Sequence, residues 1–121
     1  MPATRIVLYR EDDDTVPLLE WLDTIPDRAK AKCLVKIERL RELGHQLRRP
    51  EADYLRDEIY ELRIGLRGMN YRILYFFSGA TAVLSHGLTK ERIVPPKEIE
   101  QAIERKRKFG QKPDRHSHEE A

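Results

Sequence analysis

The sequence predicts a single α+β domain in which a four-stranded, mainly antiparallel sheet is covered by helices. Three observations indicate this fold. Residues 58–97 contain three runs rich in β-branched and aromatic residues, separated by glycine-containing turns. Two stretches with apolar residues at helical spacing precede these runs, and a third follows them. A length of 121 residues suffices for one such domain and its core, but not for two.

The first half of the chain predicts one strand and two helices. Thr4–Arg10 reads as a short strand of apolar and β-branched residues. A short helix, Val16–Asp23, carries Pro17 in its first turn, where a missing N–H is tolerated. A second helix begins at Asp27 and runs to Gly44, a residue type that often ends helices. We expect these two helices to form a hairpin across one face of the sheet.

The second half predicts the remaining strands and a final helix. Short turns join three runs into an antiparallel meander, and these runs are Ile59–Ile64, Tyr71–Phe77 and Thr81–His86. Lys97–Phe109 has an apolar stripe and forms the last helix. The predicted element order is therefore β-α-α-β-β-β-α within residues 1–110. The polar tail, residues 111–121, is expected to be disordered.

Composition excludes several classes of protein. Hydrophobic residues make up 40% of the chain and charged residues 36%, as in ordinary water-soluble domains. The longest apolar run is too short to cross a bilayer, and the N-terminus lacks an apolar signal segment, so we expect a cytoplasmic protein with no membrane partner. The single cysteine, Cys33, lies on the apolar stripe of the second helix and is expected to be a buried small hydrophobe. His116 and His118 lack a third ligand nearby, so we expect no metal and no other cofactor.

Charge is distributed unevenly along the chain. Residues 1–62 contain 11 Lys/Arg against 14 Asp/Glu, whereas residues 63–121 contain 12 against 7. The second half is therefore basic, and a phosphate backbone is the commonest partner of a basic surface. A surface that is only solvated gives the same totals, so position must decide between the two interpretations.

Alternation along the meander divides its residues between two faces. One face is apolar and is expected to contact the helices, and its members are Tyr60, Leu62, Ile64, Ile73, Tyr75 and Phe77. The opposite face collects Glu61, Arg63, Arg72 and His86 on neighbouring strands. Strict alternation also places Leu84 on the same face as His86.

Two hypotheses account for this charged face. In the first, the arginines bind a phosphate of RNA and stabilise the charge that develops as the RNA's own 2′-OH attacks it, while His86 transfers protons near neutral pH. In the second, Glu61 pairs with both Arg63 and Arg72, and the face is a structural platform of ion pairs. Glu61 decides between them, because an arginine that it leaves unpaired is available to a phosphate.

Four motifs also carry a resemblance to a known family. They are ELR at residues 61–63, NYRILYF at 70–76, VLSHGLTKE at 83–91 and PPKEIEQA at 95–102. In this order they resemble the RelE/ParE superfamily, and within it the phage-derived HigB-like branch. The resemblance covers residues 4–108 and implies a RelE-like fold.

The resemblance also implies a function. Members of this branch are toxins of type II toxin–antitoxin pairs that cleave mRNA on the ribosome and inhibit translation. A neighbouring antitoxin, usually a helix-turn-helix protein, holds them inactive and provides their contact with operator DNA. Two alternatives are a ParE-like toxin that poisons DNA gyrase without hydrolysing anything, and a non-catalytic remnant that only binds its antitoxin or nucleic acid.

Site residues follow from the matched motifs. Arg72 matches the phosphate-binding arginine of the central strand, and Arg63 matches the arginine of ELR. The segment after the last strand matches at His86, Gly87 and Lys90, but it has Glu91 where a second basic residue is common. The resemblance thus implies catalytic roles for Arg63, Arg72 and His86.

Four further cations complete the expected RNA surface. Arg92 is expected to compensate for Glu91, and Arg67 and Lys97 join Lys90 in binding the RNA backbone.

Overall fold

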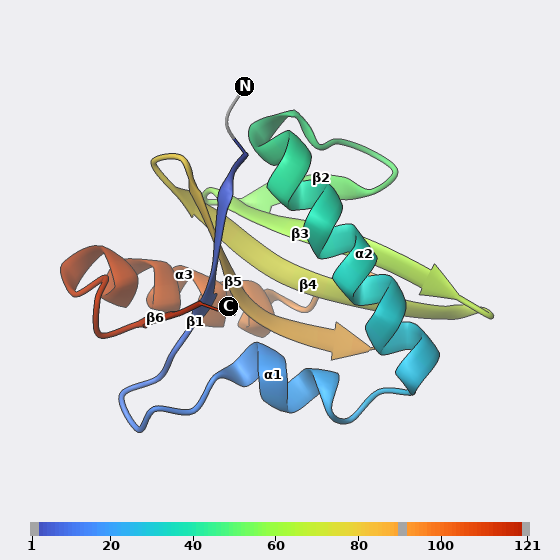
Figure 1. Ribbon diagram of the computed structural model, residues 1–121, viewed down its shortest axis with the longest axis horizontal. Coiled ribbons are helices and arrows are strands. Elements are labelled where there is room, and N and C mark those ends of the chain that lie inside the picture. The colour runs from blue at the N-terminus through green and yellow to red at the C-terminus, as the bar shows by residue number, and fades with distance from the viewer. Residues whose placement is uncertain (1–2, 90–91, 120–121) are drawn as a thin grey trace.

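The computed structural model describes residues 3–89 and 92–119 (Figure 1). The meander lies in the middle of the chain, with helices α1 and α2 before it and helix α3 after it. In order, the elements are β1 (Arg5–Tyr9), α1 (Pro17–Leu22), α2 (Asp27–Leu43), the 3₁₀ turn η1 (Gly44–Gln46), β2 (Ala52–Arg56), β3 (Ile59–Leu66), β4 (Met69–Ser78), β5 (Thr81–Thr89), α3 (Pro96–Gln111) and β6 (Ser117–His118). None of the helices in this described part is long and apolar enough to cross a membrane.

The sheet has the strand order β2-β3-β4-β5-β1-β6 in the described part of the chain. The four predicted strands form its centre, with β1 parallel to β5 and the meander antiparallel. The prediction of four strands is wrong in number, because β2 and β6 extend the sheet at its two edges. Strand β2 falls between the predicted second helix and the meander, where no strand was predicted, and its pairing with β3, at Ala52 opposite Leu62, makes it a strand.

The C-terminal tail differs from the prediction of disorder. Residues 117–118 pair with Leu8 and Tyr9 of β1 as the short antiparallel strand β6. The Arg10 Nε donates to the carbonyl of Arg115 at 3.0 Å, and the His116 ring stacks on Tyr9 at a centroid distance of 5.1 Å. Composition predicts disorder here because the tail has little apolar surface of its own, but β1 supplies the backbone partners that order it.

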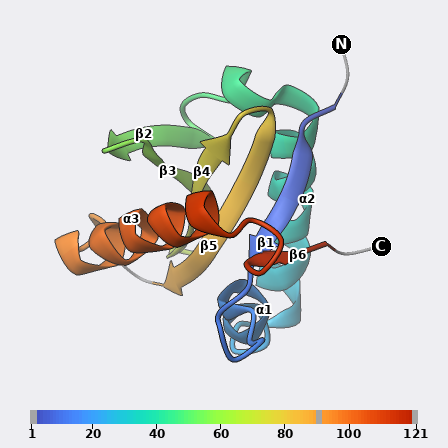
Figure 2. The ribbon, with the colours of Figure 1, turned by 90° about the vertical axis from the view of Figure 1, so that its left-hand side faces the viewer.

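Two helical layers enclose the sheet. Helices α1 and α2 cover one face, and α3 crosses the other, as the rotated view in Figure 2 shows. The predicted apolar face is confirmed, since Leu62, Ile64, Ile73 and Tyr75 pack in the core beneath α1 and α2. Cys33 of α2 is fully buried in that core, and burial raises the pKa of its thiol to about 11.

Trp21 of α1 packs against the core beneath the helices. Its indole packs edge-on against Tyr71, and its Nε1 donates to the Thr89 hydroxyl at 3.1 Å. A Cβ on Gly87 would collide with the indole ring. Gly87, which the resemblance matched together with His86, therefore makes room for the Trp21 ring of α1. Its match to the family can be explained by this packing and does not require a role in binding RNA.

A β-bulge between β4 and β5 overturns the strict alternation expected for the last strand of the meander. Leu74 pairs with His86 and Tyr75 with Leu84, so Ser85 is the extra residue between the two pairs. Leu84 consequently packs in the core beneath α1 and α2. Ser85 and His86 face α3 instead, where both contact Arg105.

Candidate functional site

The face of the sheet that carries α3 holds two adjoining groups of charged residues. We call the first the arginine row, and its members are Arg49, Asp53, Glu61, Arg63 and Arg72. We call the second the His86 network, and its members are Glu11, Ser85, His86, Glu98 and Arg105. Neighbouring strands β2, β3 and β4 supply most of the first group, whereas β5, α3 and the loop after β1 supply the second.

Glu61 lies at the centre of the arginine row. Arg63 of β3 is directly opposite Arg72 of β4, and like charges in such a pair repel each other. Glu61 is 1% exposed and relieves this repulsion, because its Oε1 accepts from Arg72 Nη1 at 2.7 Å and its Oε2 accepts from Arg63 Nε at 3.1 Å. The pairing of Glu61 with both arginines is the feature that the sequence hypothesis assigned to a structural platform.

The row nevertheless retains excess positive charge and a solvent-exposed end. Three guanidinium groups share two carboxylates, since Asp53 lies 3.4 Å from Arg63 Nη2 and 2.8 Å from Arg49 Nη2. The Arg63 side chain is 38% exposed, whereas that of Arg72 is only 12% exposed. An anion arriving from solvent would therefore meet Arg49 and Arg63 before Arg72.

The His86 ring lies beneath α3 with both nitrogens engaged. Its Nε2 is 3.0 Å from Glu98 Oε1, and its Nδ1 is 3.0 Å from Arg105 Nη1 and 2.8 Å from the Ser85 hydroxyl. A guanidinium can only donate, so we assign Nδ1 as an acceptor and place the ring proton on Nε2. In this arrangement the ring is a neutral imidazole that donates to Glu98.

Burial lowers the pKa of His86, and the positive charge of Arg105 lowers it further, against the opposing effect of Glu98. The side chain is 8% exposed. A sequence interpretation expects a histidine available to substrate, but the structure places this one between β5 and α3. In this conformation His86 joins the last helix to the sheet and does not meet solvent.

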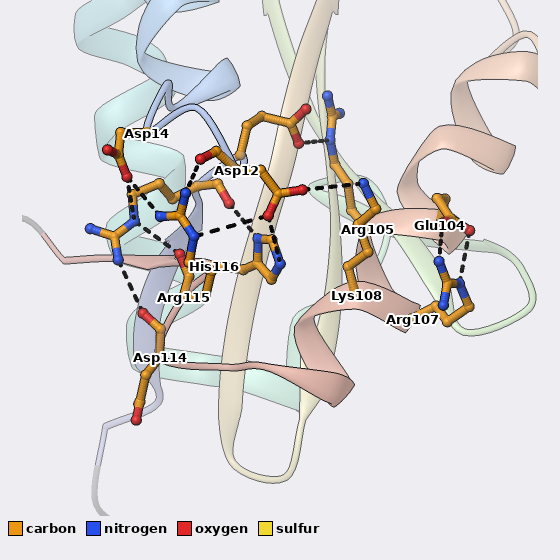
Figure 3. A network of polar contacts seen from close by, with 11 residues as sticks. Asp12, Asp14, Glu104, Arg105, Arg107, Lys108, Asp114, Arg115 and His116 are labelled. Atoms are coloured by element: carbon orange, nitrogen blue, oxygen red, sulfur yellow. Dashed lines mark hydrogen bonds and ion pairs between the residues drawn. The ribbon is translucent and has the colours of Figure 1, made fainter.

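Arg105 connects the His86 network to the chain termini. It reaches from α3 to Glu11, with Nε 3.3 Å from the carboxylate, and its guanidinium lies 5.6 Å from the centre of the Tyr9 ring. Beyond it, Asp12 lies 3.8 Å from Lys108 and 3.7 Å from His116, as Figure 3 shows. The acidic loop after β1 thus bridges α3 and the C-terminal tail.

The remaining predicted RNA-binding residues do not gather at one place. Arg67 lies in the β3–β4 turn and lines a cavity of about 320 Å³ beside the start of α2. Arg92 is exposed, and its carbonyl accepts from Arg72 Nη2 at 2.8 Å. Lys97 is exposed in the first turn of α3, and Lys90 lies outside the described residues. The structure therefore joins Arg63, Arg72 and the backbone of Arg92, and places Arg67 elsewhere.

Sequence patterns did not place Arg49 or Asp53 in the arginine row, nor Glu11, Ser85, Glu98 or Arg105 in the His86 network. Arg105 stands at position i+3 from the buried Ala102 and only 8% of it is exposed. That spacing was the available signal, because a cation on an apolar stripe requires a buried partner.

The fold and a family comparison together give the class of protein. The chain has an α+β architecture, with a helical hairpin on one face of the sheet and the arginine row on the other, and the family that it matches is RelE/toxin-like. A family model for the phage-derived Gp49-like proteins (DUF891) matches residues 20–107, and the chain belongs to this family, a toxin-like family of toxin–antitoxin systems. No curated protein matches the chain significantly. The finer HigB-like assignment stays a prediction.

Proposed function

We propose that this chain is the toxin of a type II toxin–antitoxin pair that inhibits translation by cleaving mRNA on the ribosome. Membership of the Gp49-like family supports the toxin class. The observation that supports RNA cleavage is the arginine row. In it, Arg63 of β3 lies directly opposite Arg72 on the neighbouring strand β4, and both pair with Glu61. Such a pair can contact a single phosphate from a rigid sheet.

The proposed reaction uses the substrate's own nucleophile. The 2′-oxygen forms a bond to the adjacent phosphorus, the bond from phosphorus to the 5′-oxygen breaks, and a proton passes to the departing oxygen. The products are a 2′,3′-cyclic phosphate and a 5′-hydroxyl, and this route requires no metal ion. Arg63 Nη1 and Arg72 Nε make no hydrogen bond to any residue in the ranges 3–89 and 92–119, so these donors can stabilise the charge on the phosphorane.

Proton transfer is assigned to His86 together with Glu98. His86 lies opposite Leu74, two residues along β4 from Arg72, and it shares a hydrogen bond with the Glu98 carboxylate. The Glu98 side chain is 24% exposed, so it is the solvent-facing member of the pair. A proton taken from substrate would reach Glu98 first, and His86 would hold that carboxylate in place.

The proposal also fixes the partners. A helix-turn-helix antitoxin would neutralise the toxin, and the chain would contact operator DNA only through that complex. Ribosome and mRNA would be its targets in the cytoplasm. The basic second half of the chain supports binding to RNA, because it supplies Arg63, Arg72 and Arg92.

One observation favours a second candidate function. Glu61 neutralises both arginines, and α3 covers His86, so the free chain presents an incomplete catalytic site. A protein with this arrangement would arrest growth, or bind its antitoxin, without cleaving RNA. The two candidates differ in one measurable outcome, the appearance of truncated mRNA.

Cell-free translation with toeprinting of the mRNA tests the proposal. We expect Arg63→Gln to lower the rate of mRNA truncation by about 100-fold, because it removes one charged donor to the transition state. Arg72→Lys keeps the positive charge beside Glu61 but loses the planar donor pair, so it should also be slow. Arg72→Ala is less suitable, because it removes the main partner of the buried Glu61 and threatens the fold.

Arg41→Gln is the matched control. Arg41 of α2 has a side chain 40% exposed and an ion pair to Glu38, but it lies on the opposite side of the sheet. The Arg41→Gln variant should truncate mRNA at the wild-type rate. Wild-type truncation by both Arg63→Gln and Arg72→Lys would overturn the arginine assignment. If expression arrests growth and no truncated mRNA is found, the non-catalytic candidate is favoured. If no truncated mRNA is found and the protein instead inhibits DNA supercoiling by gyrase, the ParE-like alternative is favoured.

A further inference from the structure

A cavity of about 510 Å³ opens where the segment following α2 meets the edge strand β2 and its neighbour β3. Its volume lies within the range of small-molecule sites. Aromatic rings and arginines dominate its wall, and the residues used below are His45, Arg48, Arg49, Asp53, Tyr54 and Tyr60. Its floor is apolar, since Leu47 and Ala52 also line it and both are buried.

The aromatic rings of the cavity are fixed in position. His45 stacks on Phe77 with 3.6 Å between the ring centroids, and Tyr54 meets Tyr60 edge to face at 5.2 Å. The Tyr54 hydroxyl also accepts the backbone N–H of Glu58 at 3.1 Å. Tyr54 is nevertheless 51% exposed. The cavity therefore offers an immobilised aromatic surface to solvent, which is the arrangement that stacks unpaired bases.

The charges around the cavity favour an anion. The carbonyl of Arg48 accepts from the backbone N–H groups of Glu51 and Ala52, but its exposed guanidinium makes no hydrogen bond or ion pair with any residue that the structure describes. The Arg49 side chain is 74% exposed and pairs with Asp53. Asp53 is already engaged at both oxygens, by the Tyr54 N–H at one and by Arg49 and Arg63 at the other. The carboxylate is thus compensated, and Arg48 remains available to a phosphate.

We propose that this cavity binds one nucleotide of a single-stranded RNA, with the base stacked on Tyr54 and a neighbouring phosphate held by Arg48 and Arg49. The inference rests on the proposed function for the identity of the polymer, and it adds a subsite outside the catalytic residues. Stacking contacts every base in the same way, and Asp53 is already engaged at both oxygens, so binding is tolerant of base identity.

The position of the cavity links it to the arginine row. Asp53 lines the cavity and lies 3.4 Å from Arg63 Nη2. The two sites therefore share a side chain at the edge strand β2. Tyr54 is paired with Tyr60 on the face beneath α1 and α2, and Arg63 lies on the opposite face, so an RNA strand anchored at Tyr54 would pass around β2 to reach Arg63. The subsite holds the strand, while Arg63 and Arg72 act on its phosphate.

Equilibrium binding by the full-length protein tests the subsite. The probe is a fluorescein-labelled single-stranded RNA hexanucleotide, followed by fluorescence anisotropy. We expect Tyr54→Leu and Arg48→Gln each to weaken binding by roughly tenfold, a typical loss for one stacking or phosphate contact. Tyr54→Phe keeps the ring and should bind like the wild type.

Arg28→Gln is the control for charge. Arg28 is exposed in the first turn of α2, and it too has no ion pair among the described residues, but it lies away from the cavity. Its affinity for the hexanucleotide should equal that of the wild type. Hexanucleotides of different base composition should bind with affinities within a few-fold of one another.

The outcomes separate this inference from the proposed function. Equal binding by Tyr54→Leu, Arg48→Gln and the wild type would overturn the subsite, even if Arg63→Gln abolishes mRNA truncation. Weaker binding by the two cavity variants would support it, even if the wild type truncates no mRNA. Equal weakening by Arg28→Gln would also overturn it, because the binding would then follow net charge alone.

Discussion

The arginine row and the His86 network lie on the same face of the sheet but meet different surroundings. Each has a buried charged member, Glu61 at 1% exposure and Arg105 at 8%. The row is open to solvent at Arg49 and Arg63, whereas α3 closes over the network through Ile99, Ala102 and Phe109. The difference shows that residue type does not decide whether a charged group is open to solvent. The presence or absence of a covering helix, here α3, decides it.

The two groups also differ in how their charges are balanced. In the row, one carboxylate bridges two guanidinium groups, so removal of that carboxylate leaves like charges facing each other. In the network, a neutral imidazole stands between Arg105 and Glu98, and Glu11 pairs with Arg105 directly. The row should therefore depend on Glu61 for its stability, and the network should depend on pH.

The largest expected effect comes from breaking the row at its centre. Glu61→Ala should lower the free energy of unfolding by about 3 kcal/mol, because it leaves the charge of Arg72 buried without its main partner. The partly exposed Arg63 contributes little to this loss, since solvent screens its charge. Urea denaturation of the purified variant measures the change.

Glu104→Ala is the control for this prediction. Glu104 forms an ion pair with Arg107 on the exposed side of α3 and should give no measurable change. Equal urea midpoints for Glu61→Ala and Glu104→Ala would show that Glu61 does not hold the row together.

The second effect comes from breaking the network. Arg105→Met should lower the free energy of unfolding by about 2 kcal/mol, because the Nδ1 of His86 loses one donor and the Tyr9 ring loses its cation. The same change should raise the pKa of His86, because the positive charge that lowers it is gone. Nuclear magnetic resonance titration of the His86 ring protons measures this shift, and an unchanged or lower pKa would contradict the proposed contact.

The smallest effect is a dependence of stability on pH that belongs to the network alone. The pKa of His86 is lower in the folded chain than its ordinary value of 6.5, so the unfolded chain binds more protons as the pH falls below 6.5. The stability due to the neutral ring is therefore present above pH 6.5 and is lost as the pH falls through the folded pKa. Carboxylates act in a lower window, since Arg39 and Lys36 hold the pKa of Glu51 at about 2.

Urea denaturation midpoints at pH 7.5, 6.5 and 5.5 measure the pH dependence due to His86, because carboxylates such as Glu51 titrate at lower pH. The wild type should lose stability over this range, and His86→Gln should lose less, because the amide does not titrate. A variant with the same pH dependence as the wild type would assign the effect to other groups.

Much of the fold could be predicted because local pattern and tertiary contact agree. Apolar spacing in α2 and alternation in β3 and β4 placed Cys33, Leu62 and Ile73 in the core, where the structure has them. The charged set on the opposite face was also found, together with the pairing of Glu61 that would make it a platform. Alternation failed in β5 at Ser85, because a bulge arises from the pairing of two strands and leaves no mark in either one alone.

The sequence by itself determined the helices and the four central strands in their order, the apolar face of the meander, and Glu61, Arg63 and Arg72 of the arginine row, because each depends on a repeat of two or of about four residues. Only the tertiary structure decided which charges meet solvent. It placed α3 over His86, drew Arg105 into the core and added β2 beside Arg63. These outcomes depend on contacts between segments far apart in the chain, and no local pattern encodes them.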